Sequence, residues 1–410
     1  MRFNIKILGP GLMLAAAAVG VSHLVYATRA GAEFGLSLVW LVILISILKY
    51  PAFRFAVDYA SQTNRSLVHA YSALGRAALA WLSISMAVDF FVATTAVALV
   101  TAGLFISVFD LPFSGPQVAI GLCLVTAAIL VNGSYAKAER IVKLLVLLFS
   151  MLVLVATALA LPQLGSNGRD LFGELEPGWP LAVFVIAMAG WMPMPLSGTV
   201  YVSMWAREKK KASNVDIEHK TALADLNLGW VLTVVLAVCF VLLGAAILFQ
   251  TDRVAPASAG QFATELLSIF TSAIGAWSYP LIAVAAIAVM WSGVFALMDA
   301  LPRVSARLAD HMTGREETGA SRYSVFLVIQ FVGITLILLF LMSNFGTFID
   351  FATSAGFISA PALAYFNYRA VTSAEIATDY QPTRALRIWH WIGFVAMLLF
   401  AAAFLVQRFT

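Results

Sequence analysis

Long apolar runs constrain this chain more than any other feature of its sequence. About eleven stretches of roughly 20 mostly apolar residues follow one another, and each is long enough to cross a membrane as a helix. Only 11% of the 410 residues are charged, whereas soluble domains have about 25%. The chain therefore lacks the polar surface that a soluble enzyme, a DNA-binding domain or a secreted disulfide scaffold requires. We expect an integral membrane protein.

The runs predict an all-α fold, because irregular backbone cannot face lipid and none of them alternates like a barrel strand. No soluble domain of useful size is left over, so residues 1–410 are expected to form one transmembrane domain. The expected spans cover residues 9–30, 35–57, 77–108, 115–133, 139–162, 179–205, 222–249, 274–300, 323–343, 345–368 and 386–408.

The positions of Lys and Arg predict the orientation. With a cytoplasmic N-terminus, only four of the 25 basic residues fall outside the cell, and they are Arg29, Arg169, Arg253 and Arg408. Basic residues concentrate in cytoplasmic segments of membrane proteins, and this count assigns Lys49 to that side. The bias predicts a bacterial inner-membrane protein with its N-terminus in the cytoplasm. It also explains the net charge of +4 without nucleic acid as a partner.

Two of the expected spans contain residues that interrupt helices. The sixth carries Pro193 and Pro195 within one turn, which removes two backbone donors and predicts a break. The first carries Gly20 and Ser22 near its middle. Because these spans are five helices apart, they begin two units of opposite direction. Transporters with such inverted repeats bind substrate between their broken helices.

We therefore expect one repeat over residues 9–162, a second over 179–368 and an additional helix over 386–408. The predicted fold is a 5+5 inverted repeat with broken helices 1 and 6.

The residues on either side of the first break resemble the NRAMP family of proton-coupled divalent-metal transporters. Gly9-Pro10-Gly11 leads into Arg29-Ala-Gly-Ala-Glu-Phe-Gly35 and then Leu36-Ser-Leu-Val-Trp40, which is similar to the start of that family. The resemblance implies the leucine-transporter fold, a divalent-cation cargo and coupling to protons.

The chain departs from the family at the metal site that the resemblance implies. The family's D-P-G-N motif falls on Gly20-Val21-Ser22-His23, so its metal-binding Asp and Asn are Gly20 and His23 here. The family's Met-Pro-His sequence in the sixth helix corresponds to Met192-Pro193-Met194 or Met194-Pro195-Leu196. Asp89 matches an Asp of the family's proton pathway.

These correspondences define the candidate site residues. The expected substrate-binding set is Gly20, Val21, Ser22, His23, Met192, Pro193, Met194 and Ser197. Among these, His23, Met192 and Met194 are the candidate metal ligands. His23 and Asp89 are expected in a proton pathway, because ionisable residues within a span mark function by default. Asp350 and Ser354 are expected to line an outer vestibule, whereas Asp225 and Asp299 are expected to be solvated at helix ends.

Three functions remain open at this stage. The first is a secondary-active transporter of a divalent metal cation with a rebuilt site, since no expected site residue at the two breaks is an anion and dications usually require one. The second is a related carrier of Mg²⁺ or of a small organic or anionic solute. The third is a membrane binding protein that does not transport. No enzyme motif or cofactor-binding motif is apparent, and the oligomeric state is open.

Overall fold

The protein is built almost entirely from helices, as expected. A computed structural model describes residues 9–131, 135–164, 170–213, 218–250, 259–314, 320–341 and 345–409. Within these ranges the single β-bridge joins Gly35 to Phe172. The predicted all-α class is confirmed.

Helices of the first half cover the ranges expected for spans 1–5. Its helices are α1 (Pro10–Ala18), η1 (Ser22–Ala27), α2 (Thr28–Phe34), α3 (Val39–Thr63), α4 (Leu67–Leu74), α5 (Arg76–Val88), η2 (Asp89–Ala93), α6 (Thr94–Phe109), α7 (Gly115–Leu130), α8 (Tyr135–Ala160) and η3 (Leu161–Gln163). Spans 1 and 3 are each built from several of these pieces.

Helices of the second half cover the ranges expected for spans 6–11. Its helices are α9 (Trp179–Trp191), α10 (Gly198–Ser213), α11 (His219–Ile247), α12 (Ala259–Ile274), η4 (Ala276–Ser278), α13 (Tyr279–Thr313), α14 (Ala320–Leu336), η5 (Ile337–Leu341), α15 (Phe345–Val371), η6 (Thr378–Tyr380) and α16 (Arg384–Phe409). Helices α10 and α13 continue well beyond the predicted ends at residues 205 and 300, because apolarity marks the lipid-crossing part of a helix and not its full length.

Length and composition identify the membrane-crossing helices. Seven helices of the described ranges could span a bilayer, or eight if the bent pair of span 1 is counted as one, which is fewer than the eleven predicted. Helices α7 and α9 are shorter but apolar. Large apolar side chains such as Leu144, Phe340 and Leu399 are strongly exposed, which is the pattern of a surface that faces lipid.

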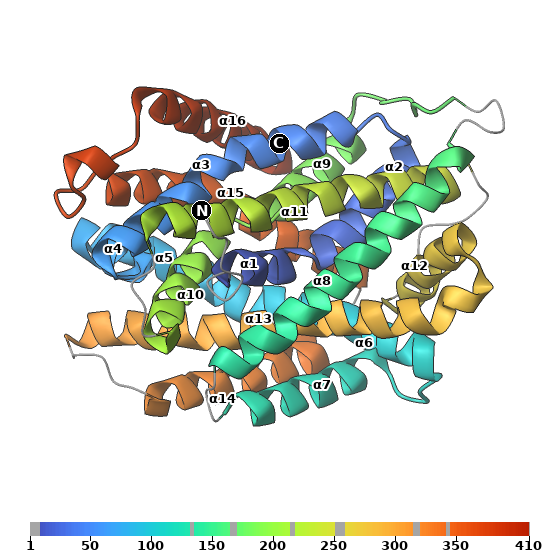
Figure 1. Ribbon diagram of the computed structural model, residues 1–410, viewed down its shortest axis with the longest axis horizontal. Helices are drawn as coiled ribbons and strands as arrows, with labels where there is room; N and C mark the ends of the chain where they lie inside the picture. The colour runs from blue at the N-terminus through green and yellow to red at the C-terminus, as the bar shows by residue number, and fades with distance from the viewer. Residues whose placement is uncertain are drawn as a thin grey trace.

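Helix α1 lies in the middle of the bundle (Figure 1), where it contacts α8, α10, α11 and α13. All of its residues except Ala17 are buried, so the first break is enclosed by protein. Irregular backbone at membrane depth is tolerated only where protein or a cavity surrounds it.

Two α-helices of the described ranges lie outside the spans and were not predicted. Helix α4 follows span 2, and α12 precedes span 8. Each is shorter than a membrane span and less uniformly apolar, so a search for long apolar runs passes over both.

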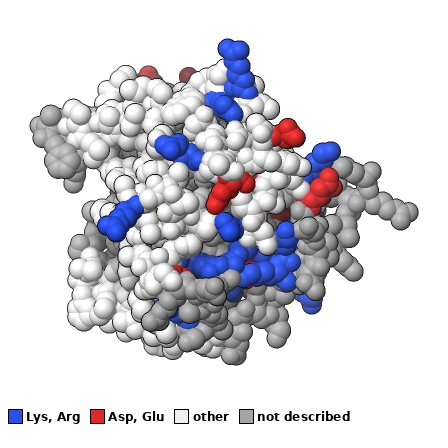
Figure 2. Space-filling view, turned by 90° about the vertical axis from the view of Figure 1, so that its left-hand side faces the viewer, with Lys and Arg blue, Asp and Glu red and all other residues white. Residues whose placement is uncertain are grey.

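Basic residues gather at one end of the molecule. Figure 2 shows this face, which lies at the left of Figure 1, where α3, α10 and α13 end. Contacts between distant segments hold the face together: Glu375 pairs with Arg65 and His69, and Asp310 pairs with Arg322. Partial burial acts to raise the pKa of Glu375, but the hydrogen bond from Tyr59 and the charges of His69 and Arg65 outweigh it and lower the pKa.

Candidate functional site

Span 1 is broken at the predicted position. Helix α1 ends at Ala18, a π-helix begins at Ser22, and the axes of the two halves differ by 52°. The Ser22 hydroxyl donates to the Ala18 carbonyl at 2.9 Å. This bond gives a donor to a carbonyl at the C-terminal end of α1. Gly20 is buried, yet a Cβ built on it would have no heavy atom within 4 Å. Open space therefore adjoins the break.

Span 6 is also broken where two prolines were found. Helix α9 ends at Trp191 and α10 begins at Gly198. The intervening segment includes Met192 and Met194, which are buried, and the Met192–Pro193 peptide bond is cis. The Met194 thioether lies against Gly198, because a Cβ at Gly198 would be 2.7 Å from its sulfur.

Both ring nitrogens of His23 have partners. Nε2 lies 2.9 Å from the Thr233 carbonyl oxygen of α11 and therefore donates to it. Nδ1 lies 2.8 Å from the Ser22 hydroxyl. In this arrangement Nε2 has no lone pair for a metal ion, and the Ser22 oxygen lies in front of Nδ1. Ligation by His23 would require one of these bonds to break.

Asp89 joins span 3 to the second half of span 6. It begins the π-helix η2 within span 3, and its carboxylate accepts a hydrogen bond from the Tyr201 hydroxyl of α10. Ser197 lies beside the same two groups. The structure therefore brings together two predicted residues, Asp89 and Ser197, whereas His23 bonds to α11. Tyr201 was not predicted, since nothing in a tyrosine within an apolar helix points to a partner 112 residues away.

Lys49 was assigned to the cytoplasmic side, and this prediction was wrong. It lies near the middle of the 25-residue helix α3 and is 1% exposed. Its ammonium donates to carbonyls of the span 6 break, including Ala189 at 2.6 Å and Met192 at 2.8 Å. The sequence could have identified Lys49 as a candidate site residue, because it is an ionisable residue within an apolar span. It was instead counted with the basic residues that follow it in the sequence.

Asp225 and Asp299 were expected to be solvated, and both are buried. Asp225 of α11 accepts hydrogen bonds from the backbone N–H groups of Gly9 at 3.1 Å and Gly11 at 2.7 Å. It thereby binds the N-terminal end of α1, which carries unpaired donors and a positive dipole end. Asp299 is paired with Arg303 in the next turn of α13.

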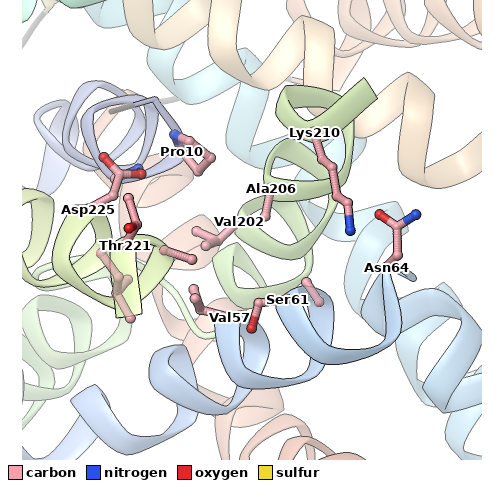
Figure 3. A pocket seen from close by; sticks show the side chains of 13 residues that line it. Pro10, Val57, Ser61, Asn64, Val202, Ala206, Lys210, Thr221 and Asp225 are labelled. Atoms are coloured by element: carbon pink, nitrogen blue, oxygen red, sulfur yellow. The ribbon is translucent and has the colours of Figure 1, made fainter. Parts of the chain in front are cut away.

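A pocket that is open to solvent lies where α1 begins. Figure 3 shows side chains of α1, α3, α10 and α11 converging on it, with Asp225 beside Pro10. It was not predicted from the sequence. The predicted outer vestibule is described only in part: Ser354 is half-buried on α15, and the side chain of Asp350 lies outside the described part.

Comparisons with known proteins agree with this architecture. The sequence profile of the family described as natural resistance-associated macrophage protein-like (Nramp) matches residues 11–407. An uncharacterised protein of Pasteurella multocida (strain Pm70) is 28% identical over 406 residues, which cover 98% of this chain and 92% of that protein.

Solved structures show the same fold at low identity. A mutant manganese transporter of Eremococcus coleocola has a TM-score of 0.71 at 14% identity, over 96% of this chain and 84% of that one. MhsT in complex with L-phenylalanine has a TM-score of 0.65 at 15% identity, over 95% and 97% of the two chains. These neighbours have the leucine-transporter fold, which confirms the predicted fold class.

The profile covers nearly the whole chain, and the helices adopt the fold of solved manganese transporters. This chain therefore belongs to the Nramp family and has the fold of solved membrane transporters.

Proposed function

We propose that the chain is a secondary-active, proton-linked transporter of a divalent cation that keeps part of its water shell. The space beside Gly20 carries this proposal. The family's motif places a metal-binding Asp at this position. Here the residue is glycine, and a Cβ built on it would have no heavy atom within 4 Å. Such a space can hold water molecules around an ion. Mg²⁺ dehydrates reluctantly and usually keeps several waters, so it is the first cargo to test.

Three further observations support this proposal. Family membership supports a cation as cargo. The buried Asp89–Tyr201 pair between spans 3 and 6 supports proton coupling, because an acid within the membrane can exchange a proton as its partner moves. The two helix breaks support repeats over residues 9–162 and 179–368, with 386–408 as an addition.

A small organic or anionic solute is the second candidate cargo. The observation that favours it is Lys49, whose ammonium puts a positive charge at the span 6 break. The fold itself accepts such cargo, since MhsT is described in complex with L-phenylalanine. A fold alone does not determine function.

Uptake into proteoliposomes tests the proposal. We expect Mg²⁺ uptake that rises with an inward proton gradient and exceeds Mn²⁺ and Ca²⁺ uptake measured in the same preparation. His23→Gln keeps a donor for the Thr233 carbonyl but removes a titratable ring, so it should retain fold and lose proton dependence.

Lys220→Ala serves as the matched control, because Lys220 is an exposed residue at the start of α11. It should transport as the unaltered protein does. If no divalent cation enters under any gradient, the cation proposal is wrong. Uptake of an amino acid in its place would establish the second candidate.

A further inference from the structure

Lys49 holds an ammonium group inside the span 6 break. Its Nζ lies 2.6 Å from the carbonyl oxygen of Ala189, 3.0 Å from Gly190, 2.8 Å from Met192 and 3.2 Å from Met194. The side chain is buried and reaches this point from the middle of α3. All four of these partners are backbone carbonyls.

The sequence explains why these carbonyls are available. In a continuous helix the Ala189 carbonyl would accept from the N–H of residue 193, but that residue is proline and has none. The carbonyls at the C-terminal end of a helix lack intrahelical donors and carry the negative end of its dipole. Several oxygens therefore converge with no partner within α9.

Converging carbonyls at a broken helix form a cation site in transporters of this architecture. Unwound carbonyls and the C-terminal ends of half-helices coordinate the coupling cations of such proteins, and rings of carbonyls bind monovalent cations in channels. An ammonium group is itself a compact monovalent cation with three donors. The four distances around Nζ are those of hydrogen bonds to a bound cation.

We propose that these four carbonyls are a monovalent-cation site that is permanently filled by the chain's own Lys49 ammonium. The site takes a small ammonium or alkali cation from solution once this side chain is removed. The inference does not depend on which cargo is transported.

An apolar groove that is open to the surface lies beside the site. It lies between α3, α9, α15 and α16, and both Lys49 and Ala189 line it. Truncation of the lysine stem would extend this groove to the four oxygens. A methylammonium ion would reproduce the lost head group there, whereas choline has no N–H donor and is too bulky.

Cation rescue of Lys49→Ala tests the proposal on purified protein in detergent. In choline buffer we expect this variant to have a clearly lower Tm than the unaltered protein, because four buried carbonyls lose their donor. Methylammonium, K⁺ or Na⁺ at equal ionic strength should restore at least half of the lost Tm. The unaltered protein should not respond, since its site is filled.

Further variants separate a cation site from a simple helix cap. Lys49→Met fills the stem volume without a charge, so its Tm should fall and stay low in every cation. Lys220→Ala should neither lose Tm nor respond. If Lys49→Ala does not survive extraction in choline, the monodisperse fraction recovered in methylammonium relative to choline measures the same rescue.

Two outcomes would overturn the proposal. If no small cation restores Lys49→Ala, the lysine is a structural cap only. If the unaltered protein gains as much Tm as the variant, the cation acts elsewhere. Because no gradient or cargo is used, a failed rescue leaves the transport proposal untouched, and absent transport leaves this proposal untouched.

Discussion

Each of three ionisable side chains within the spans is bound to a different helix. His23 bonds to Thr233 of α11, Lys49 to the end of α9, and Asp89 to Tyr201 of α10. A charged or polar group in a low-dielectric interior is costly unless it has hydrogen-bond partners. These pairings therefore link spans 1, 2 and 3 to the second half of the chain through a few specific contacts.

A substitution that removes one oxygen atom tests the Asp89–Tyr201 contact. Tyr201→Phe removes the hydroxyl and leaves a buried acceptor without its donor, which costs about 1–3 kcal/mol of stability. If Asp89 carries the proton, the pH profile of uptake should also move. Thermal melting and uptake across a pH series measure the two effects.

Tyr71→Phe is the control for a purely structural loss. Its buried hydroxyl donates to the Leu363 carbonyl and to Asn367, so its removal should lower Tm without a shift of the pH profile. Equal shifts in the two variants would contradict a proton-carrying role for Asp89.

Sequence reasoning identified some of these residues and missed others for a physical reason. His23 and Asp89 stand out as polar residues in apolar runs. Lys49 is equally isolated, but it lies five residues before Arg54 and was counted with the basic residues at the cytoplasmic end of the span. Tyr201 could not be identified, because its role depends on a contact between elements far apart in the chain.

At the scale of elements, both halves of span 1 pack closely against α11 through glycines. A Cβ on Gly229 would be 2.0 Å from the Gly11 carbonyl oxygen, and a Cβ on Gly244 would be 2.2 Å from that of Thr28. Real Cβ atoms do not approach so closely, so each position requires a hydrogen in place of a methyl group. The broken helix is thus held along both of its halves by a single unbroken helix.

Gly244→Ala should destabilise the protein although alanine favours helix formation. The added methyl group would force α2 and α11 apart, and overpacking of this kind costs about 1–3 kcal/mol. Gly121→Ala in α7 is the matched control, since a Cβ there meets nothing within 4 Å. Helix propensity alone predicts that it gains up to about 1 kcal/mol. Thermal melting that ranks the two variants equally would contradict the packing argument.

The breaks themselves were predictable to different degrees. Pro193 and Pro195 predict the interruption of span 6 directly. The break at Gly20 was expected mainly from its matching place in the other repeat. The π-helices of spans 1 and 3 leave no comparable mark in the sequence.

At the scale of the whole molecule, charge distinguishes the two ends. The ends of α3 and α13, the short helix α4 and the loop at Glu375 form one basic face. The opposite end carries the Arg29–Glu33 pair and the bridge from Gly35 to Phe172. We propose that the basic face is cytoplasmic, as the distribution of Lys and Arg predicts.

Cysteine labelling in intact cells tests this orientation. Ala73→Cys on α4 and Glu174→Cys near Phe172 place a thiol at exposed positions on the two ends. A membrane-impermeant thiol reagent should label Glu174→Cys from outside and Ala73→Cys only after permeabilisation. Cys123 and Cys239 are buried, so the unaltered protein gives the background. The reverse labelling pattern would show that the orientation is inverted.

Lys49 also has a consequence for how membrane voltage acts on this protein. A dissociable ion that crosses the bilayer moves its whole charge through the membrane field, which is worth about 2.3 kcal/mol per 100 mV. The Lys49 ammonium is covalently attached to α3 and can move no further than its stem allows. The positive charge at the span 6 break therefore stays with the protein and is not carried across the membrane. It adds little to the current that accompanies transport.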